Sequence, residues 1–303
     1  MENIVRSEQE LVRRGKLSAI RDFCNPYPDK YEVTNSISEA RLLDDGIENV
    51  SIAGRIVFLR KMGKLSFIRI RDIEDSIQIS FQMDLLGEDN YKFFKSNIDV
   101  GDFIGVCGEM VTTQTGEKTL RAHSFTFLGK ALRPLPEKFH GLTDQEMKYR
   151  SRYVDLIMNE DSRERFMFRS KLIWEIRKYL NGKGYTEIET PILNNKASGA
   201  MARPFVTHHN ALDIDLYLRI APETYLKRAI IGGFTKVYEF ARCFRNEGMD
   251  TTHLQDFTML EGYGAYMNYR DNMKFLREMI QEVVMNLFGK LEIKINGEVV
   301  DLS

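Results

Sequence analysis

Charged side chains gather in one segment of the chain, residues 237–266, where they interrupt runs of apolar residues. Arg245 and Glu247 lie two positions apart, as do Glu261 and Tyr263. Residues two apart on a strand face the same side, so a hairpin here would bring a guanidinium, two carboxylates and a phenol together. A guanidinium binds phosphates and carboxylates through paired donors, and carboxylates attract ammonium groups. Solvated cross-strand ion pairs explain the same spacing, so the pattern alone leaves both interpretations open.

The elements that would position these residues are predicted from apolar periodicity. Helices are expected at 144–158, 160–181, 222–231 and 270–288, and strands at 204–208, 215–220, 236–242 and 256–266. The final stretch predicts a hairpin that turns at Asn296-Gly297, a dipeptide suited to a two-residue turn. This mixture of strands and helices predicts an α+β domain.

The N-terminal half shows a different pattern. Helices are predicted at 2–23 and 36–45, and short strands rich in β-branched and aromatic residues follow between 50 and 130. A helix at 89–96 fits between the third and fourth of these strands. This order is the outline of an OB-fold β-barrel, a common binder of single-stranded nucleic acid. Residues 131–142 hold two prolines and a glycine, which predicts a hinge.

Bulk composition limits the class of protein. The chain of 303 residues carries 43 Lys and Arg against 44 Asp and Glu, a net charge of -1. That balance excludes a wholly basic surface but permits a local basic patch. The widely spaced Cys24, Cys107 and Cys243 favour reduced thiols in a cytoplasmic protein. The charged N-terminus lacks the apolar core of a signal peptide, and no run of about 18 apolar residues is present, so we expect no membrane partner.

Several collinear motifs resemble class II aminoacyl-tRNA synthetases of the lysyl type. The matching segments are 131–136 and 139–142 in the hinge, 184–191 (motif 1), 202–205, 207–210, 217–223 (the amino-acid-binding strand), 244–247 and 259–263 (motif 2). The resemblance runs from the N-terminal helix to the last residue. It implies an OB-fold barrel followed by a partial antiparallel class II sheet with flanking helices.

The same resemblance suggests a domain organisation. The expected parts are a helical extension at 1–47, an OB-fold anticodon-binding domain at 48–130, a hinge and linker helix at 131–159, and an incomplete catalytic domain at 160–303.

The resemblance also implies roles for single residues. The implied ATP site is Arg245, Glu247, His253 and Phe257, with Arg245 and Glu247 as the catalytic residues. The implied lysine site is Gly199, Glu223, Glu261 and Tyr263. Arg245 would bind the α-phosphate, and Phe257 would stack on adenine. In the barrel, Arg60, Phe67 and Gln78 match the positions that read the central anticodon uridine, with Lys61, Lys64, Arg69 and Arg71 contacting phosphates. Without the family, a barrel-core role for Phe67 is the simpler interpretation.

The implied reaction is lysine–tRNA ligation. Lysine and ATP would give lysyl-adenylate and pyrophosphate, and the lysyl group would then pass to the 3′ end of tRNA(Lys). ATP is a substrate in this scheme, and Mg²⁺ is expected as a cofactor with ligands beyond residue 303. A homodimer formed through motif 1 is implied, and no DNA partner is expected.

The sequence departs from the family in three places, of which the change from Gly-Gly to Ser198-Gly199 is the smallest. In the motif 2 loop, Thr252 and Leu254 stand where the family has Arg and Asn, and Gln255 replaces a Pro, which predicts weaker ATP binding. Motif 3, with a second ATP-binding Arg, is not found. The 303-residue chain alone is therefore expected to be deficient in aminoacylation, which lysine-dependent ATP–pyrophosphate exchange would test.

Two alternatives compete with the ligase. One is a non-catalytic tRNA-binding or dimerising paralogue that lacks motif 3. A lysine pocket would have no use in such a module, so the retained Glu223 and Arg245 argue against it. The other is an aspartyl- or asparaginyl-type relative with the same barrel. Carboxylates at Glu223 and Glu261 suit a basic substrate and argue against that alternative.

Overall fold

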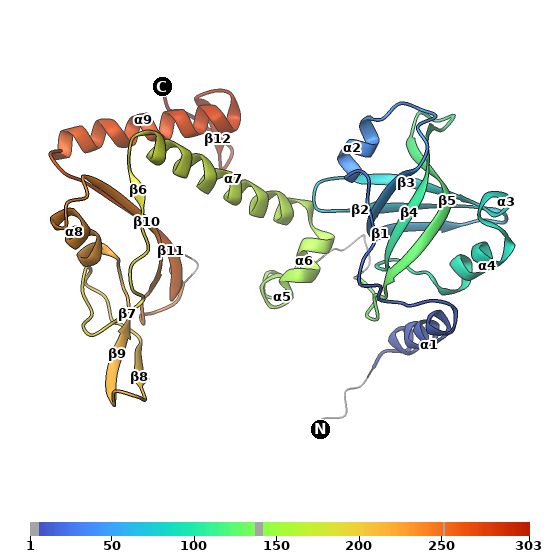
Figure 1. Cartoon of the computed structure of the whole chain (residues 1–303), viewed down its shortest axis with the longest axis horizontal. Coiled ribbons are helices and arrows are strands. Elements are labelled where there is room, and N and C mark those ends of the chain that lie inside the picture. Colours follow the sequence, from blue (N-terminus) through green and yellow to red (C-terminus); the bar gives the residue numbers. More distant parts are fainter. Residues whose placement is uncertain (1–5, 137–141, 251) are drawn as a thin grey trace. The chain divides into compact units, whose positions relative to one another are not determined.

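The computed structural model describes residues 6–136, 142–250 and 252–303. It separates the chain into two compact units, residues 1–163 and 164–303. Each unit has its own strands and helices, as Figure 1 shows, so the α+β fold class is confirmed. The predicted helix start at 2–5 and the hinge residues 137–141 lie outside the described residues.

The first unit is built around a barrel. Its elements in chain order are α1 (Glu8–Phe23), α2 (Ile37–Leu42), β1 (Val50–Lys61), β2 (Leu65–Arg71), β3 (Ser76–Gln82), α3 (Met83–Leu86), α4 (Glu88–Asn97), β4 (Phe103–Thr112) and β5 (Lys118–Gly129). The strands close in the order β1-β2-β3-β5-β4. The pairing of β3 with β5 is parallel, and the other pairings are antiparallel. The predicted OB-fold barrel is therefore confirmed.

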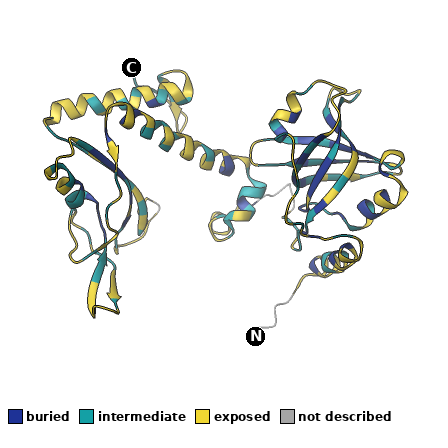
Figure 2. Ribbon diagram, viewed as in Figure 1, coloured by how far each residue is buried: buried dark blue, intermediate teal, exposed yellow. Residues whose placement is uncertain are grey.

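Alternation along the strands gives the barrel its apolar core. In β2, Ser66, Ile68 and Ile70 are buried, while Phe67 and its odd-numbered neighbours are partly exposed. The inward residues of the strands form one apolar cluster with residues from α2 and α4, seen as dark blue along the barrel strands in Figure 2. Each fully buried Ile or Leu in such a core contributes about 1.5–3 kcal/mol.

The helices after the barrel differ from the prediction. The single helix expected at 144–158 is two helices, α5 (Gln145–Arg150) and α6 (Arg152–Met158), so that prediction is wrong. The chain leaves helical geometry at Ser151, where φ is -121° and ψ is 52°. The buried Asp155 of α6 accepts hydrogen bonds from Asn159 and Ser162, and so fixes the entry into α7 (Glu160–Gly182).

The second unit holds two small sheets and a terminal hairpin. Its elements after α7 are β6 (Thr186–Glu187), β7 (Leu193–Asn194), β8 (Val206–His209), β9 (Ile214–Leu218), α8 (Glu223–Ile231), β10 (Lys236–Phe244), β11 (Asp256–Gly264), α9 (Tyr269–Phe288), β12 (Glu292–Ile295) and β13 (Glu298–Asp301). The sheets have the orders β11-β10-β6 and β7-β9-β8. The last hairpin turns at Asn296 and Gly297, both with positive φ, as the dipeptide predicts.

Helices cover one face of the β11-β10-β6 sheet. Tyr238 of β10 is fully buried in a cluster with Leu180 of α7, and Phe275 of α9 packs against the same cluster. Even-numbered residues of β10 therefore face the helices, which leaves its odd-numbered residues on the opposite face. None of the described helices combines the length and apolar character needed to cross a bilayer.

Candidate active site and nucleic-acid interface

The register of β10 and β11 decides which predicted residues share a face. Glu239 lies opposite Glu261, and Cys243 lies opposite Phe257. Opposed residues of an antiparallel pair face the same side, and Tyr263 follows Glu261 by two positions. Glu261, Tyr263 and Phe257 therefore lie together on the face that α7 and α9 do not cover.

Glu223, Glu261 and Tyr263 form a small acidic group on this face. Glu261 is half-buried and accepts a hydrogen bond from the Tyr263 hydroxyl at 3.0 Å. Burial raises the pKa of Glu261, and the carboxylates of Glu223 and Glu239 raise this pKa further. Burial and the neighbouring Glu261 raise the pKa of Tyr263. Negative potential thus accumulates at a partly dry position, where an ammonium ligand would be stabilised.

Glu223 belongs to this group through the start of α8. Its carboxylate forms an ion pair with Lys227, one turn along the helix. Gly199 lies beside it with φ +90°, and an added Cβ there would come within 3.1 Å of the Cβ of Glu223. Ser198 and Thr224 are joined by a 3.2 Å hydrogen bond between their hydroxyls. The 198–199 loop is therefore held against α8, and glycine is required there by conformation and by space.

Arg245 lies on the same side, immediately after β10. Its guanidinium carbon is 5.1 Å from the ring centroid of Phe257, and its backbone N–H donates to the carbonyl of Gln255 at 2.8 Å. Within the described part of the chain, its side-chain Nε is buried and has no hydrogen-bond partner. A buried guanidinium N–H without an acceptor is costly, so this position suits an anionic group.

Glu247 is placed differently from the expectation. Because β10 ends at Phe244, Arg245 and Glu247 lie in a loop, and the strand alternation invoked for that pair does not apply. The Glu247 carboxylate accepts a hydrogen bond from the backbone N–H of Arg203 at 3.1 Å. The backbone N–H of Asn246 donates to the Arg203 carbonyl at 2.7 Å. Glu247 therefore joins two loops.

His253 lies in an exposed turn. Asp250 accepts hydrogen bonds from the backbone N–H groups of Thr252 and His253, and its carboxylate contacts His253 Nδ1 at 2.8 Å. These bonds hold the pKa of the Asp250 carboxyl well below its usual range. The side chains that order this loop, Asp250 and Thr252, were not predicted, although an Asp two residues before a Thr is typical of such turns.

A buried ion pair supports the face from within. Arg219 and Glu239 are both buried, and Arg219 Nη1 lies 2.6 Å from Glu239 Oε1. Thr190 donates to the other carboxylate oxygen at 2.7 Å, and Arg219 Nε donates to the carbonyl of Arg242 at 2.8 Å. The motif 1 segment, the end of β9 and β10 are thereby tied together. The sequence signal was a charged residue inside an apolar run, in Leu218-Arg219-Ile220, which points to a buried partner.

The three residues predicted to read an anticodon share the outer face of the barrel. Arg60 lies opposite Phe67, and Gln78 lies opposite Arg69. Phe67 is only partly buried, while Ile68 beside it points into the core. The simpler interpretation of Phe67 as a core residue is therefore wrong. The Gln78 side chain donates to the Thr119 hydroxyl at 2.9 Å.

A β-bulge in β1 gives Arg60 its direction. The register with β2 shifts between Ile56 and Phe58, so one residue is unpaired there. Ile56 is buried, yet Phe58 and Arg60, which keep the same parity, are exposed. A bulge re-aims the side chains that follow it, and alternation without the bulge would have turned Arg60 inward.

The predicted phosphate contacts are largely engaged within the protein. Lys61 donates to the carbonyls of Lys95 and Ile98 at 2.5 and 2.9 Å. Arg69 pairs with Glu117 at 2.6 Å. Arg71 donates to the carbonyl of Ile157. Of the four predicted residues, Lys64 is the fully exposed one.

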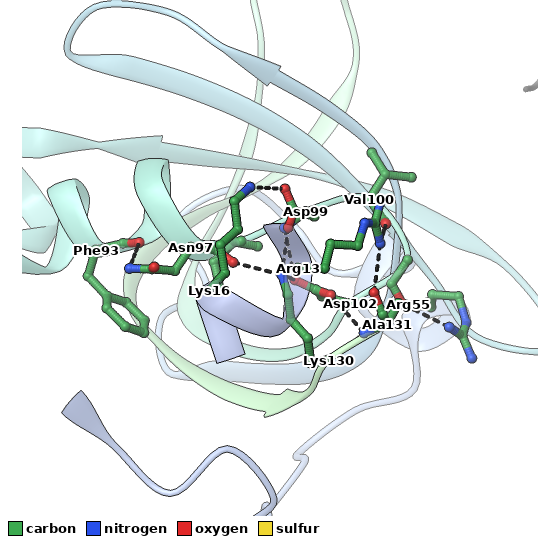
Figure 3. A network of polar contacts seen from close by, with 12 residues as sticks. Arg13, Lys16, Arg55, Phe93, Asn97, Asp99, Val100, Asp102, Lys130 and Ala131 are labelled. Atoms are coloured by element: carbon green, nitrogen blue, oxygen red, sulfur yellow. Dashed lines mark hydrogen bonds and ion pairs between the residues drawn. The ribbon is translucent and has the colours of Figure 1, made fainter. Parts of the chain in front are cut away.

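A polar network at the base of the barrel was also not predicted (Figure 3). The Lys130 side chain is fully buried, and its Nζ lies 2.7 Å from both Asp99 Oδ2 and Asp102 Oδ2. Lys16 of α1 reaches Asp99, and Arg13 donates to the carbonyls of Val100 and Ala131. The N-terminal helix is thereby attached to the strand ends and to the first hinge residue.

Lys130 acts to lower the pKa of both carboxylates of this network. Burial raises the pKa of Asp102, which Lys130 only partly offsets. Burial also acts on Asp99, but the hydrogen bonds from Lys130 and Lys16 outweigh it and lower that pKa. Lys16, Asp99 and Lys130 are far apart in the sequence, with no regular spacing between them. Only the fold brings them together, so the sequence did not predict this network.

Two family models match successive parts of the chain. Residues 50–128 match an OB-fold nucleic acid binding domain, and residues 144–301 match the tRNA synthetases class II (D, K and N). The chain belongs to the class II tRNA synthetases of the D, K and N group.

Three relatives in this family are lysine–tRNA ligases. A lysine–tRNA ligase of Enterococcus faecalis is 48% identical over 98% of this chain. A lysine–tRNA ligase of Streptococcus pneumoniae is 47% identical, and one of Lactococcus lactis subsp. cremoris is 46% identical, each over 98% of the chain. The chain spans 61% to 62% of the length of these relatives.

Proposed function

We propose that the chain carries the lysine-activating face and the anticodon-binding barrel of a lysine–tRNA ligase. The observation that carries this proposal is the buried Nε of Arg245, which has no hydrogen-bond partner among the described residues. It lies on the same side of the sheet as Glu261 and Tyr263. Arg245 suits an anionic ligand, and the acidic group of Glu223, Glu261 and Tyr263 suits a cationic one. Lysine held beside the phosphates of ATP meets both requirements.

The proposed chemistry has two steps. A carboxylate oxygen of lysine attacks the α-phosphorus of ATP, the bond to pyrophosphate breaks, and lysyl-adenylate forms. The 3′-terminal hydroxyl of tRNA(Lys) then attacks the carbonyl carbon, and AMP leaves. No protein nucleophile is required, since positioning alone can supply about 7–11 kcal/mol.

In this scheme each side chain binds a substrate or orients it. Arg245 stabilises the charge that develops on the α-phosphate, because its donors form a planar fork. One face of the Phe257 ring lies under Arg245, and adenine would stack on the other. Glu247 and His253 would line the ATP site, with Glu247 also holding the 203 loop against it.

The acidic group would select lysine. Glu223 accepts the α-amino group, Gly199 lets the backbone approach it, and Glu261 with Tyr263 contributes to binding the amino groups. A neutral or acidic analogue would leave these carboxylates unpaired, which is costly in a partly dry site.

Mg²⁺ is expected with ATP in this family. Among the described residues, no group of three or more His, Cys, Asp or Glu side chains could hold a metal ion. We therefore assign no step to the ion.

The barrel would bind the anticodon of tRNA(Lys) through Arg60, Phe67 and Gln78. Phe67 stacks on a splayed base, worth about 1–3 kcal/mol, and Arg60 and Gln78 bond its polar edge. The outward position of Phe67 supports this role.

A homodimer through motif 1 is also part of the proposal, together with a cytoplasmic location. Helix α7 precedes motif 1 and carries Trp174, the single Trp of the chain, which is 65% exposed. A large exposed aromatic suits an interface core. Trp174 fluorescence should shift to shorter wavelength as protein concentration rises, and Trp174→Glu should sediment as a monomer. An unchanged sedimentation coefficient in that variant would contradict a dimer formed through motif 1.

Ligand-induced thermal stabilisation tests the substrate. Lysine should raise the melting temperature of the chain, because a ligand at 100 times its Kd stabilises by about 2.7 kcal/mol. Aspartate should leave it unchanged. Stabilisation by aspartate, or by neither amino acid, would contradict the assignment.

A further inference from the structure

Phe58 is an exposed aromatic residue on the outer face of the barrel. Its side chain is 46% exposed. The bulge after Ile56 turns it outward, and its direct partner on β2 is Arg69. It therefore lies on the face that carries Arg60 and Phe67, where β1 and β2 run side by side (Figure 1).

The four residues form an alternating square. Phe58 lies opposite Arg69, and Arg60 lies opposite Phe67. Each Phe thus has an Arg across from it and another two positions along its own strand. Diagonal neighbours on one face of an antiparallel pair are about 7–8 Å apart, so the two rings lie within reach of consecutive bases of a splayed strand.

This arrangement has the chemistry of a single-strand platform. Aromatic rings accept bases of any sequence by stacking, and cations between the rings bind the backbone. Arg60 is exposed, and Arg69 forms a partly exposed ion pair with Glu117. The exposed Lys64, in the turn between β1 and β2, adds positive charge at the edge of the square. A single exposed Phe on a protein surface needs no explanation. Phe58, however, has Phe67 as its diagonal neighbour on the same face.

We propose that Phe58 is a second base-stacking residue, and that it holds a nucleotide adjacent to the one held by Phe67. The proposal rests on the proposed anticodon-binding function of the barrel. The ligand is the single-stranded loop of an RNA, and Phe58 contributes affinity for a base beside the central one without reading its identity.

The test compares Phe58→Leu with Phe67→Leu and with a matched control, Phe103→Leu. Phe103 is also an outward strand residue at 40% exposure. It lies on β4, the other neighbour of β1, opposite Arg55. The full chain is titrated with an anticodon stem-loop of tRNA(Lys). Loss of one stacked base should weaken binding about 5- to 150-fold, while Phe103→Leu should leave the Kd unchanged and Phe58→Tyr should keep wild-type affinity.

Stem-loops that lack a single base show which base each Phe contacts. Removing a base next to the central position should cancel the effect of Phe58→Leu but preserve that of Phe67→Leu. Removing the central base should do the reverse. Matching melting temperatures show that the variants are folded.

The outcomes separate the two proposals. If Phe67→Leu weakens binding and Phe58→Leu does not, the second stacking position is wrong and the anticodon face stands. If Phe58→Leu acts equally on every abasic loop, its effect is not stacking and the inference also fails. If neither variant changes the Kd, the anticodon-binding function of this face is wrong.

Discussion

The Lys130 network gives the sharpest prediction of stability. The variant Lys130→Met keeps most of the length of the side chain and removes its charge. It deletes contacts of 2.7 Å to Asp99, 2.7 Å to Asp102 and 2.8 Å to the Asn97 carbonyl. Asp99 retains Lys16, but Asp102, whose side chain is fully buried, loses its ion-pair partner.

The expected cost follows from that uncompensated charge. Breaking a buried ion pair by removing one partner costs about 3–5 kcal/mol. For a unit of this size, about 2–4 °C of melting temperature corresponds to each kcal/mol, so the first unit should melt about 6–20 °C lower. The backbone N–H groups of Asp99 and Ala131, which still donate to Asp102, favour the lower end.

The assay is thermal and urea unfolding followed by circular dichroism. The matched control is Lys118→Met, because Lys118 forms an ion pair with Asp45 near the surface, with exposures of 22% and 51%. Such a pair contributes at most about 1 kcal/mol. The double variant Lys130→Met with Asp102→Asn should recover part of the loss. If Lys130→Met costs no more than Lys118→Met, the reasoning about the buried charge is refuted.

The pH dependence of this variant has a definite sign. Burial raises the pKa of Asp102 in the folded state, and losing Lys130 raises it further. A carboxyl with a raised folded pKa is destabilising when ionised, and protonation relieves the penalty. The stability gap between Lys130→Met and the wild type should therefore narrow as pH falls toward the folded pKa of Asp102. A gap that widens in acid would contradict this account.

Three further predictions concern the second unit. Gly199→Ala forces a side chain into φ +90° and within 3.1 Å of the Glu223 Cβ; it should cost about 1–3 kcal/mol and abolish thermal stabilisation by lysine, and an unchanged lysine response would contradict it. Calorimetric titration should show lysine affinity rising with pH through the raised pKa of Glu261, above 4.5, because only the ionised carboxylate attracts an ammonium; a pH-independent Kd would exclude this role. Arg219→Met strands the buried Glu239 and should cost about 3–5 kcal/mol in urea, whereas Arg177→Met, whose partner is partly exposed, should cost about 1 kcal/mol or less; equal losses would count against the buried pair.

Periodicity and turn chemistry were enough to predict much of the fold. The alternating residues of β2 and the turn at Asn296-Gly297 are local signals, so the barrel strand and the last hairpin follow from short segments. The break at Ser151 was missed because neither Pro nor Gly marks it. A single residue that leaves helical geometry has no compositional mark.

The candidate site was predictable only where spacing fixes direction. Glu261 and Tyr263 share a face because both lie on β11, as their spacing predicts. Arg245 and Glu247 have the same spacing but lie beyond the end of β10, so contacts with the 203 loop decide the direction of Glu247. The bulge before Phe58 is likewise invisible in composition, although it determines which β1 residues after Ile56 face outward.

The most direct test of the central claim is the affinity of a non-hydrolysable lysyl-adenylate analogue, measured by calorimetry. If Arg245 receives the phosphate position and the Glu261 group receives the amino groups, Arg245→Met and Glu261→Gln should each weaken binding strongly. Loss of a charged hydrogen-bond partner costs about 1.5–3 kcal/mol. The aspartyl analogue should bind poorly to the wild type. Equal binding of both analogues, or no loss in either variant, would show that this face does not hold the adenylate.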